Sequence, residues 1–361
     1  MTTRELNILP QFLKNNWEET KQHFIKWWNR DGFVLGQWES GIAAHRVSAE
    51  SESIAQFYTD PNWRADHNLA MLSHRVYPAD ILPIADTDIG PGSLSLYLGC
   101  QAGFADHTVW FHPCMTDLKA HPPLVFSTEQ KWWKTHYAIL QQCLKASRGR
   151  FLVPCPDLVE GLDILASIRG TQELLIEMLE NPELIHTRLE QISTAWSVAY
   201  ESIYDLIKDQ DGGCSYGAFR LWAPGRVAKI QCDCSAMISP ATFREFVFPY
   251  LNQQCNCLDY SMYHLDGTQC MCHLEQVLAI ENLTAVEWTP QTGIPDGGDP
   301  VWYGVYKKIL DAKKAVQVVG IKPHEIIPLV DEIGAKGIYL LTQFSSEQQA
   351  ELLYRQLETY I

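Results

Sequence analysis

Five short apolar runs, each followed by an amphipathic stretch, dominate the second half of the chain. The runs are VAKIQCDC (227–234), SMYHLD (261–266), LTAVEW (283–288), AVQVVG (315–320) and GIYLLT (337–342). Each run has the length of a buried strand, and the stretch after it places apolar residues at helical spacing. Alternation of strand and helix is typical of a parallel sheet covered by helices. The pattern therefore predicts five successive βα units.

The first half has longer amphipathic stretches and fewer apolar runs. The helical stretches are residues 11–29, 50–76, 127–146 and 171–208. The strand-like runs are residues 33–38, 80–85 and 150–155, and TVWFHP (108–113) is predicted as an extra strand in an insertion. Pro182 lies inside the last helical stretch and predicts two helices there, the second starting near Asn181 and Pro182.

Eight strands in this order favour an α/β fold, a single (β/α)8 TIM barrel that occupies residues 1–361 as one domain. The helix expected before the first strand makes residues 1–30 an N-terminal helical extension. The alternative is an open doubly wound sheet, which would need a glycine-rich phosphate loop after its first strand. In a barrel, the chemistry lies at the carboxyl ends of the strands.

Composition narrows the class of protein. The 361 residues carry 28 basic and 43 acidic side chains, a formal charge of −15, which argues against a nucleic-acid partner. No apolar run approaches the roughly 20 residues of a membrane helix. The first residues show no charged-then-apolar signal pattern, so we expect a cytoplasmic protein that acts on a small molecule. In that compartment the eleven cysteines are expected to be thiols.

His264 and Asp266 form the sharpest pair at the predicted rim. Side chains two apart on a strand point to the same face, so both residues can face the barrel mouth. A histidine and a carboxylate there can bind a metal, or act as a base with its orienting partner. The alternative is an aspartate that caps the next helix and a histidine that packs in the mouth.

Further carboxylates follow other predicted strands. Asp86 and Asp88 are a same-face pair in which one group can hold a raised pKa suited to acid catalysis, or they belong to a solvated turn. Asp233 lies between Cys232 and Cys234, so on a strand it faces the opposite way to both thiols. Free cysteines are more often apolar fillers than ligands.

Tryptophans accompany several of these positions. The residues are Trp38, Glu39, Trp110, Trp222, Glu287 and Trp288, all near predicted strand ends or loops. Carboxylates beside aromatic faces can hold a cationic or sugar-like ligand, and these residues are therefore candidates for substrate binding. The alternative is that tryptophan fills space in a barrel mouth.

The order of motifs resembles the uroporphyrinogen decarboxylase superfamily, over roughly residues 75–360. The segments that carry the resemblance are YPADILPIADTDI (77–89), FLVPCPDLVEGLDILASIRG (151–170), QCDCSAMISPATFREFVFPYL (231–251), YHLDG (263–267), AVEW (285–288) and VVGIKP (318–323). The first segment is similar to one that ends in a catalytic Asp, matching Asp86 or Asp88. YHLDG stands where the family's methyltransferases carry a zinc-binding H-x-C-G.

The resemblance implies a metal-assisted methyltransferase acting on a small methylated substrate or a methyl-corrinoid. Zinc would be held by His264 and Asp266, with Glu287 or a cysteine of the Cys232/Cys234 pair completing the set. A corrinoid protein is the expected partner, and the family often forms homodimers. The catalytic candidates are Asp86, Asp88, Asp233, His264 and Glu287. Two alternatives stay open: a metal-free decarboxylase or lyase that uses Asp86 or Asp88 as acid, and a non-catalytic binder of a small ligand.

Overall fold

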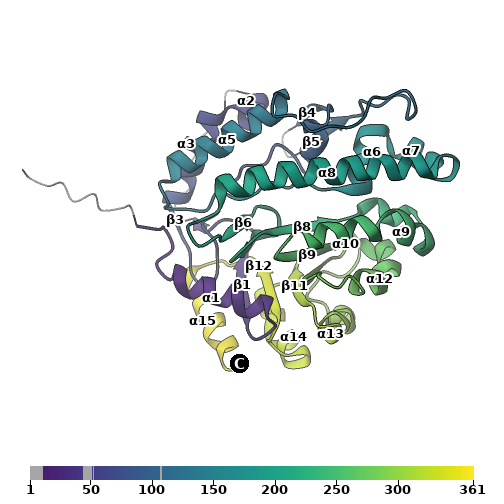
Figure 1. Cartoon of the computed structure of the whole chain (residues 1–361). Helices are drawn as coiled ribbons and strands as arrows, with labels where there is room; N and C mark the ends of the chain where they lie inside the picture. Colours follow the sequence, from purple (N-terminus) through teal and green to yellow (C-terminus); the bar gives the residue numbers. More distant parts are fainter. Residues whose placement is uncertain (1–10, 44–50, 52, 106–107) are drawn as a thin grey trace, which may run out of the picture.

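The computed structural model describes residues 11–43, 51, 53–105 and 108–361. Its centre is a sheet of six parallel strands in the order β1–β12–β11–β10–β9–β8 (Figure 1). These strands are β1 (Phe33–Gln37), β8 (Val227–Gln231), β9 (Tyr260–Asp266), β10 (Ala285–Thr289), β11 (Ala315–Val319) and β12 (Ile338–Thr342). The first strand of the sequence pairs with the last, so the sheet curls as it does in a barrel.

The five βα units predicted for the second half are confirmed. Strands β11 and β12 are buried over their whole length, which is why their sequences are apolar at almost every position. The helices that follow β8 to β12 lie outside the sheet (Figure 1). They are η2 (Asp233–Met237), α9 (Pro240–Phe246), α10 (Phe248–Asn256), α11 (Gly267–Cys270), η3 (Met271–His273), α12 (Leu274–Leu278), η4 (Pro300–Trp302), α13 (Tyr303–Asp311), η5 (Pro323–Glu325), α14 (Ile326–Ile333) and α15 (Glu347–Glu358).

The helical stretches of the first half are divided more finely than their periodicity predicts. The helices are α1 (Trp17–Trp28), α2 (Ile54–Thr59), α3 (Pro61–Ser73), α4 (Leu94–Tyr97), α5 (Lys131–Ser147), α6 (Gly161–Arg169), α7 (Thr171–Glu180) and α8 (Pro182–Ile207). The predicted break at Pro182 is confirmed. The stretch 50–76 contains two helices, because the Asp60 carboxylate caps α3 by accepting the N–H groups of Asn62 and Trp63.

Helix α1 confirms a helix in the predicted N-terminal extension, of which residues 1–10 lie outside the described residues. Two tryptophans tie α1 to the barrel. The Trp27 indole donates a hydrogen bond to the carbonyl of Val316 at the start of β11, and the Trp28 indole donates to the carbonyl of Trp222. Helix α1 therefore covers the end of the sheet at which the strands begin.

The closed barrel of eight strands predicted from the sequence is not found. Residues 80–85 and 150–155 form no strands and are joined by an isolated bridge between Ile84 and Leu152, and Cys155 is bridged to Tyr216. Both segments contain proline, Pro83 in the first and Pro154 in the second, and proline has no N–H to donate to a ladder. The fold is thus a TIM-barrel-like α/β arrangement whose six-stranded parallel sheet stays open.

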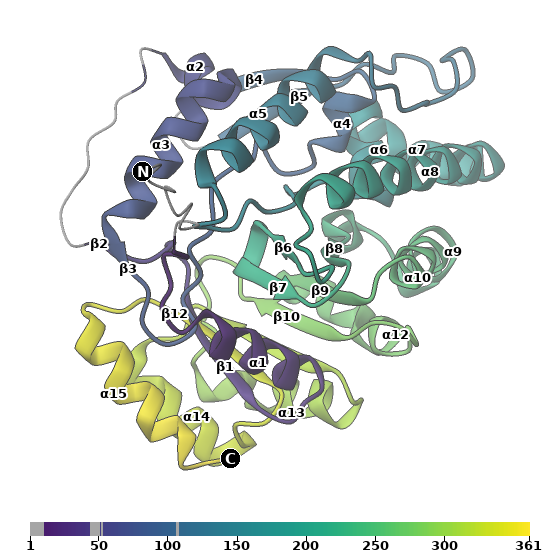
Figure 2. The same cartoon turned by 60° about the vertical axis from the view of Figure 1, so that its left-hand side comes forward.

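Three antiparallel hairpins complete the strands: β2 (Ile42–Ala43) with β3 (Arg75–Val76), β4 (Gln101–Ala105) with β5 (Thr108–His112), and β6 (Cys214–Tyr216) with β7 (Leu221–Ala223). Strand β5 confirms the extra strand predicted at 108–113. The β6–β7 hairpin lies beside β8 (Figure 2), and Tyr216 at the end of β6 is bridged to Cys155. The 3-10 turn η1 (Ala218–Arg220) connects its two strands.

All eleven cysteines are free thiols in this structure. Within the described part of the chain, none of the helices combines the length and the hydrophobicity that crossing a membrane requires.

Candidate functional site

The register of the parallel strands places His264 on β9 between Gln231 on β8 and Glu287 on β10. His264 Nδ1 and Glu287 Oε2 are 2.5 Å apart. The Glu287 side chain is fully buried, and its second oxygen accepts a hydrogen bond from the Thr289 hydroxyl at 2.6 Å. Because an ionised carboxylate only accepts hydrogen bonds, His264 donates through Nδ1. Its Nε2 is thereby left free to bind a ligand.

Asp233 and Asp266 join His264 to form a group of three donors. One ligand atom from each of the three side chains lies within 4.8 Å of the others. Asp266 ends β9 two residues after His264 and shares its face, as the spacing predicted. Asp233 comes from η2, the turn that follows β8. We call Asp233, His264, Asp266 and Glu287 the histidine cluster.

The local electrostatics of the histidine cluster reflect burial and neighbouring charges. Burial lowers the pKa of His264, but the charge of Glu287 and the hydrogen bond to it outweigh burial, so the pKa ends above its ordinary value. Burial and the Asp163 carboxylate raise the pKa of Asp233 to about 6. A positive charge placed beside such carboxylates stabilises their ionised form.

Asp163 of α6 fixes the position of Asp233. Its carboxylate accepts the backbone N–H groups of Asp233 and Cys234 at 2.8 and 2.9 Å, which holds the start of η2. Because η2 is helical, the strand alternation stops, and Cys234 lines the same cavity as Asp233. Sequence reasoning had set the two on opposite faces. Neither Cys232 nor Cys234 belongs to the group of three donors found among the described residues.

A cavity of about 520 Å³ opens beside the histidine cluster. Asp163, Gln231, Asp233 and Cys234 form its polar side, and Trp110 on the β4–β5 hairpin is part of its apolar side. The Trp110 side chain is 66 % exposed, so its ring is accessible to a ligand. The insertion predicted from the sequence thus supplies a wall of the cavity.

A second group of charges lies around residues 86–88. The buried Arg64 guanidinium donates to Asp86 Oδ1 and to the carbonyl of Asp88, both at 2.9 Å. Burial raises the pKa of Asp88 to about 7, and the carboxylates of Asp86 and Asp157 add to the rise. Arg220 lies within electrostatic reach of both Asp86 and Asp88. We call Arg64, Asp86, Asp88 and Arg220 the arginine cluster.

A chain of polar contacts links the two clusters. Asp88 Oδ1 accepts the backbone N–H of Asp157 at 2.7 Å, and the Asp157 carboxylate binds the ammonium of Lys229 at 2.8 Å. Lys229 contacts Gln231, whose amide donates to Asp233 Oδ2 at 2.8 Å. The carboxylates predicted at separate strand ends are therefore joined by one chain of polar contacts. Sequence reasoning missed Lys229, because a lysine inside a strand pattern gives no sign that it is buried.

The tryptophans divide into exposed and buried ones. Trp38 at the end of β1 is 38 % exposed, and its ring lies 5.4 Å from that of Phe219. Trp222 is buried against Trp17 and Phe24 at the opposite end of the sheet from the mouth, so the structure does not bring it to the site.

Trp288 and Glu39 also lie apart from the histidine cluster. Trp288 is fully buried against Trp302, on the opposite face of β10 from Glu287. Glu39 is largely exposed and lies 3.6 Å from Arg75. Neither residue contributes a contact to the histidine cluster.

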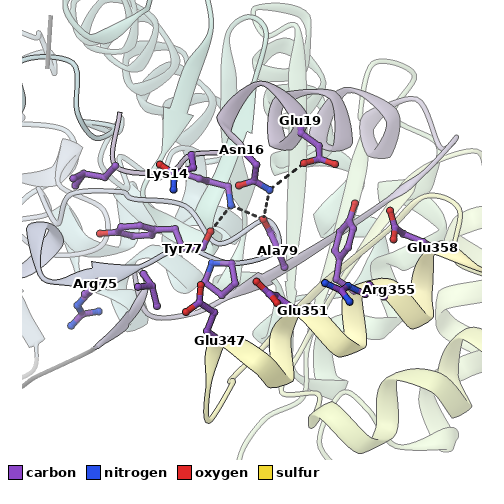
Figure 3. Close-up of a pocket in the computed structure, with 15 residues that line it drawn as sticks. Lys14, Asn16, Glu19, Arg75, Tyr77, Ala79, Glu347, Glu351, Arg355 and Glu358 are labelled. Atoms are coloured by element: carbon purple, nitrogen blue, oxygen red, sulfur yellow. Dashed lines mark hydrogen bonds between the residues drawn. The ribbon is translucent and has the colours of Figure 1, made fainter. Parts of the chain in front are cut away.

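Another cavity, of about 540 Å³, lies away from the strand ends, between the start of α1 and α15. Figure 3 shows Lys14 pointing to the carbonyls of Tyr77 and Ala79, with Glu347 and Glu351 on the facing helix α15. Burial lowers the pKa of Lys14 to about 8. The Lys14 ammonium already donates hydrogen bonds to these two carbonyl groups, which gives Lys14 a structural role.

The histidine cluster fits a divalent cation by its donor types. An imidazole nitrogen and two carboxylates are accepted ligands of zinc, and a carboxylate on the far nitrogen of the histidine is the usual companion of such a ligand. Hard oxygen donors also suit manganese or magnesium. The arginine cluster offers instead a carboxyl group that can be protonated near neutral pH, beside two guanidinium groups.

The structure is similar to that of a methyltransferase from Methanosarcina mazei. The TM-score is 0.61 at 11% sequence identity, and the similarity covers 95% of this chain and 99% of that chain. At this identity the likeness concerns the fold. A scan against protein-family models finds no match, and a search of curated proteins finds none either.

Proposed function

We propose that this chain is a divalent-cation-dependent enzyme of the methyltransferase type, in which Asp233, His264 and Asp266 hold the cation. The observation that carries the proposal is the convergence of these three donors, with His264 oriented by the buried Glu287. The motif order supports placing the enzyme in the uroporphyrinogen decarboxylase superfamily. Zinc is the proposed metal, and a methyl-corrinoid carried by a partner protein is the proposed methyl source.

The chain's own residues would prepare the site as follows. Glu287 keeps the proton of His264 on Nδ1, which leaves Nε2 as a ligand throughout the reaction. Asp163 holds Asp233 in place through backbone N–H groups. A bound divalent cation supplies Lewis acidity, which lowers the pKa of a coordinated thiol or water. The adjoining cavity with Trp110 would position the small substrate.

Metal content tests this proposal directly. We expect purified protein to bind about one zinc ion per chain at neutral pH, measured by elemental analysis and by titration calorimetry after removal of metal. The His264→Ala variant should lose this binding, because the cluster loses the ligand that Glu287 orients. His324→Ala is the matched control, since His324 is 77 % exposed and lies outside the cluster. A wild-type chain that takes up no divalent metal would overturn the proposal.

Methyl transfer itself can be followed with free methylcobalamin and a small thiol, through the absorbance change on loss of the methyl group. We expect turnover that chelator abolishes and zinc restores. Turnover that persists in chelator would point away from the histidine cluster.

A second candidate is metal-free decarboxylation or lyase chemistry with Asp88 as the acid. It is favoured by one observation: a pKa of about 7 lets the Asp88 carboxyl group donate a proton near neutral pH. Activity of this kind on a small carboxylic acid would survive chelator and be lost in Asp88→Asn. The two candidates thus predict opposite responses to chelator.

A further inference from the structure

Two consecutive residues of the turn between β6 and β7 have an unusual backbone. Phe219 and Arg220 have φ values of 57° and 53°, in the left-handed region that residues with a Cβ rarely adopt. Side chains from the sheet hold this turn. The Gln317 amide of β11 donates to the carbonyl of Phe219 at 2.8 Å, and the Tyr339 hydroxyl of β12 donates to the carbonyl of Arg220 at 3.0 Å. The conformation is therefore imposed by the fold, as at many ligand-binding sites.

The turn carries the Arg220 side chain into the mouth. Its Nε donates to the carbonyl of Trp38 at 2.6 Å, which orients the guanidinium group. Among the described residues, Nη1 and Nη2 of Arg220 have no hydrogen-bond partner, and Arg220 forms no ion pair. Asp86 and Asp88 lie within its electrostatic reach. Asp86 is already paired with Arg64, and Asp88 is neutralised in part by its raised pKa.

The charge balance around Arg220 favours an anion. Arg64 and Arg220 are both guanidinium groups, whereas burial raises the pKa of Asp88 to about 7 and so reduces its negative charge near neutral pH. Arg220 is half-buried, and neither Nη1 nor Nη2 is among the fully buried polar atoms without a partner, so a ligand can reach them. An anionic ligand with two oxygens would match both free nitrogens of the guanidinium fork.

Arg220 is also close to the histidine cluster. The ring of its neighbour Phe219 lies 4.8 Å from the His264 ring on one side and 5.4 Å from the Trp38 ring on the other. Phe219 therefore contacts both His264 of the histidine cluster and Trp38, the residue whose carbonyl accepts the hydrogen bond from Arg220.

We propose that Arg220 binds the carboxylate of a small substrate through Nη1 and Nη2, with the reacting end of that substrate directed at the histidine cluster past Phe219. The direction of the reacting end toward the histidine cluster rests on the proposed function. The binding of the carboxylate by Arg220 does not depend on it. The substrate class is thus a small aliphatic carboxylic acid, and Arg220 determines specificity for its anionic end.

The test compares small carboxylates with their neutral amides. Acetate, glutarate and N,N-dimethylglycine, each beside its carboxamide, are titrated into wild-type protein and followed by calorimetry and by thermal unfolding. We expect at least one acid to bind and its amide to bind at least about tenfold more weakly. Arg220→Met should weaken binding of that acid about 10- to 100-fold. Arg220→Lys should restore part of it, because lysine keeps the charge without the fork.

Arg355→Met on α15 is the control, because Arg355 is exposed and lies outside the mouth; it should bind the acid as wild type does. Equal affinity of wild type and Arg220→Met for the acid would overturn the proposal. So would failure of every acid to bind, or tighter binding of inorganic phosphate than of any acid. Zinc titration of Arg220→Met separates the two proposals. If Arg220→Met loses carboxylate binding and keeps zinc binding, both proposals are supported. If the wild-type chain binds no zinc but binds the carboxylate through Arg220, only the proposal of the carboxylate site is supported.

Discussion

The two clusters that share the mouth are built in different ways. Apart from Asp233 on η2, the histidine cluster stands on regular strands: His264 and Glu287 face each other because β9 and β10 pair in register. In the arginine cluster, Arg64 stands on helix α3, whereas the other members stand on segments without regular strand structure, residues 86–88 and the strained turn at Phe219 and Arg220. Regular pairing fixes a side chain by geometry alone, whereas an irregular segment needs dedicated hydrogen bonds from its neighbours to hold one.

The difference has a consequence for charge. In the histidine cluster the innermost charge is compensated: Glu287 is buried with both oxygens bonded. In the arginine cluster compensation is partial, since burial raises the pKa of Asp88 and Arg220 has free nitrogens. A metal centre needs fixed ligands, and a substrate-binding group needs unsatisfied ones. Each of the following experiments breaks or sharpens this contrast.

Removing the link between the clusters should have the largest effect. Lys229→Met leaves the buried Asp157 carboxylate without its cation, and we expect the free energy of unfolding to fall by about 3–5 kcal/mol in urea titrations. Lys307→Met removes an exposed pair with Glu332 and should cost less than about 1 kcal/mol. Similar losses in both variants would show that the two clusters are not joined through Lys229.

The titration of Asp88 should have the next largest effect. Its pKa rises from 3.8 to about 7 on folding, so the folded state holds the proton more tightly than the unfolded chain. Below pH 4 Asp88 is protonated in both the folded and the unfolded state. As the pH rises from 4 to 7 the unfolded chain releases this proton first, so the free energy of unfolding falls. The Asp88→Asn variant has no carboxyl group at this position and does not lose stability in this way. The free energy of unfolding of the variant minus that of wild type should therefore be larger at pH 8 than at pH 4, by roughly 2–4 kcal/mol.

Urea titrations of both proteins across this pH range measure that difference. Asp311→Asn is the control, because Asp311 is exposed. A difference between Asp88→Asn and wild type that does not change with pH would mean that folding leaves the pKa of Asp88 unchanged.

Orientation of His264 by Glu287 should have an intermediate effect. Glu287→Gln keeps the shape but loses the charge, and the amide no longer enforces Nδ1–H on His264. We expect zinc affinity to fall about 10- to 100-fold by calorimetry. Glu351→Gln, an exposed change on α15, should leave the affinity as it is. If both variants bind zinc equally, Glu287 does not orient a metal ligand.

Glu39→Gln should have the smallest effect. Glu39 lies at the rim, is 61 % exposed and stands 3.6 Å from Arg75. We expect its free energy of unfolding to change by less than about 1 kcal/mol. A larger loss, measured by urea titration, would mean that the rim beside the arginine cluster is as tightly organised as the strands.

The fold could be predicted well where strands are apolar and lack proline. The five βα units after residue 226 and the break at Pro182 follow from periodicity and from the missing proline N–H. The prediction failed at residues 80–85 and 150–155, which have strand-like composition. Pro83 and Pro154 remove ladder donors from these segments, and the β6–β7 hairpin takes the place beside them.

The sequence by itself determined which residues lie at the strand ends, because alternation along a strand and the order of βα units are local properties. His264, Asp266 and Glu287 could be assigned to the mouth on that ground. Only the tertiary structure decided that Glu287 pairs with His264 and that Asp233 turns toward it from η2. It also decided that Arg220 enters the mouth. These depend on register and on a turn held by Gln317 and Tyr339, residues about 100 positions away in the chain, which no local pattern encodes.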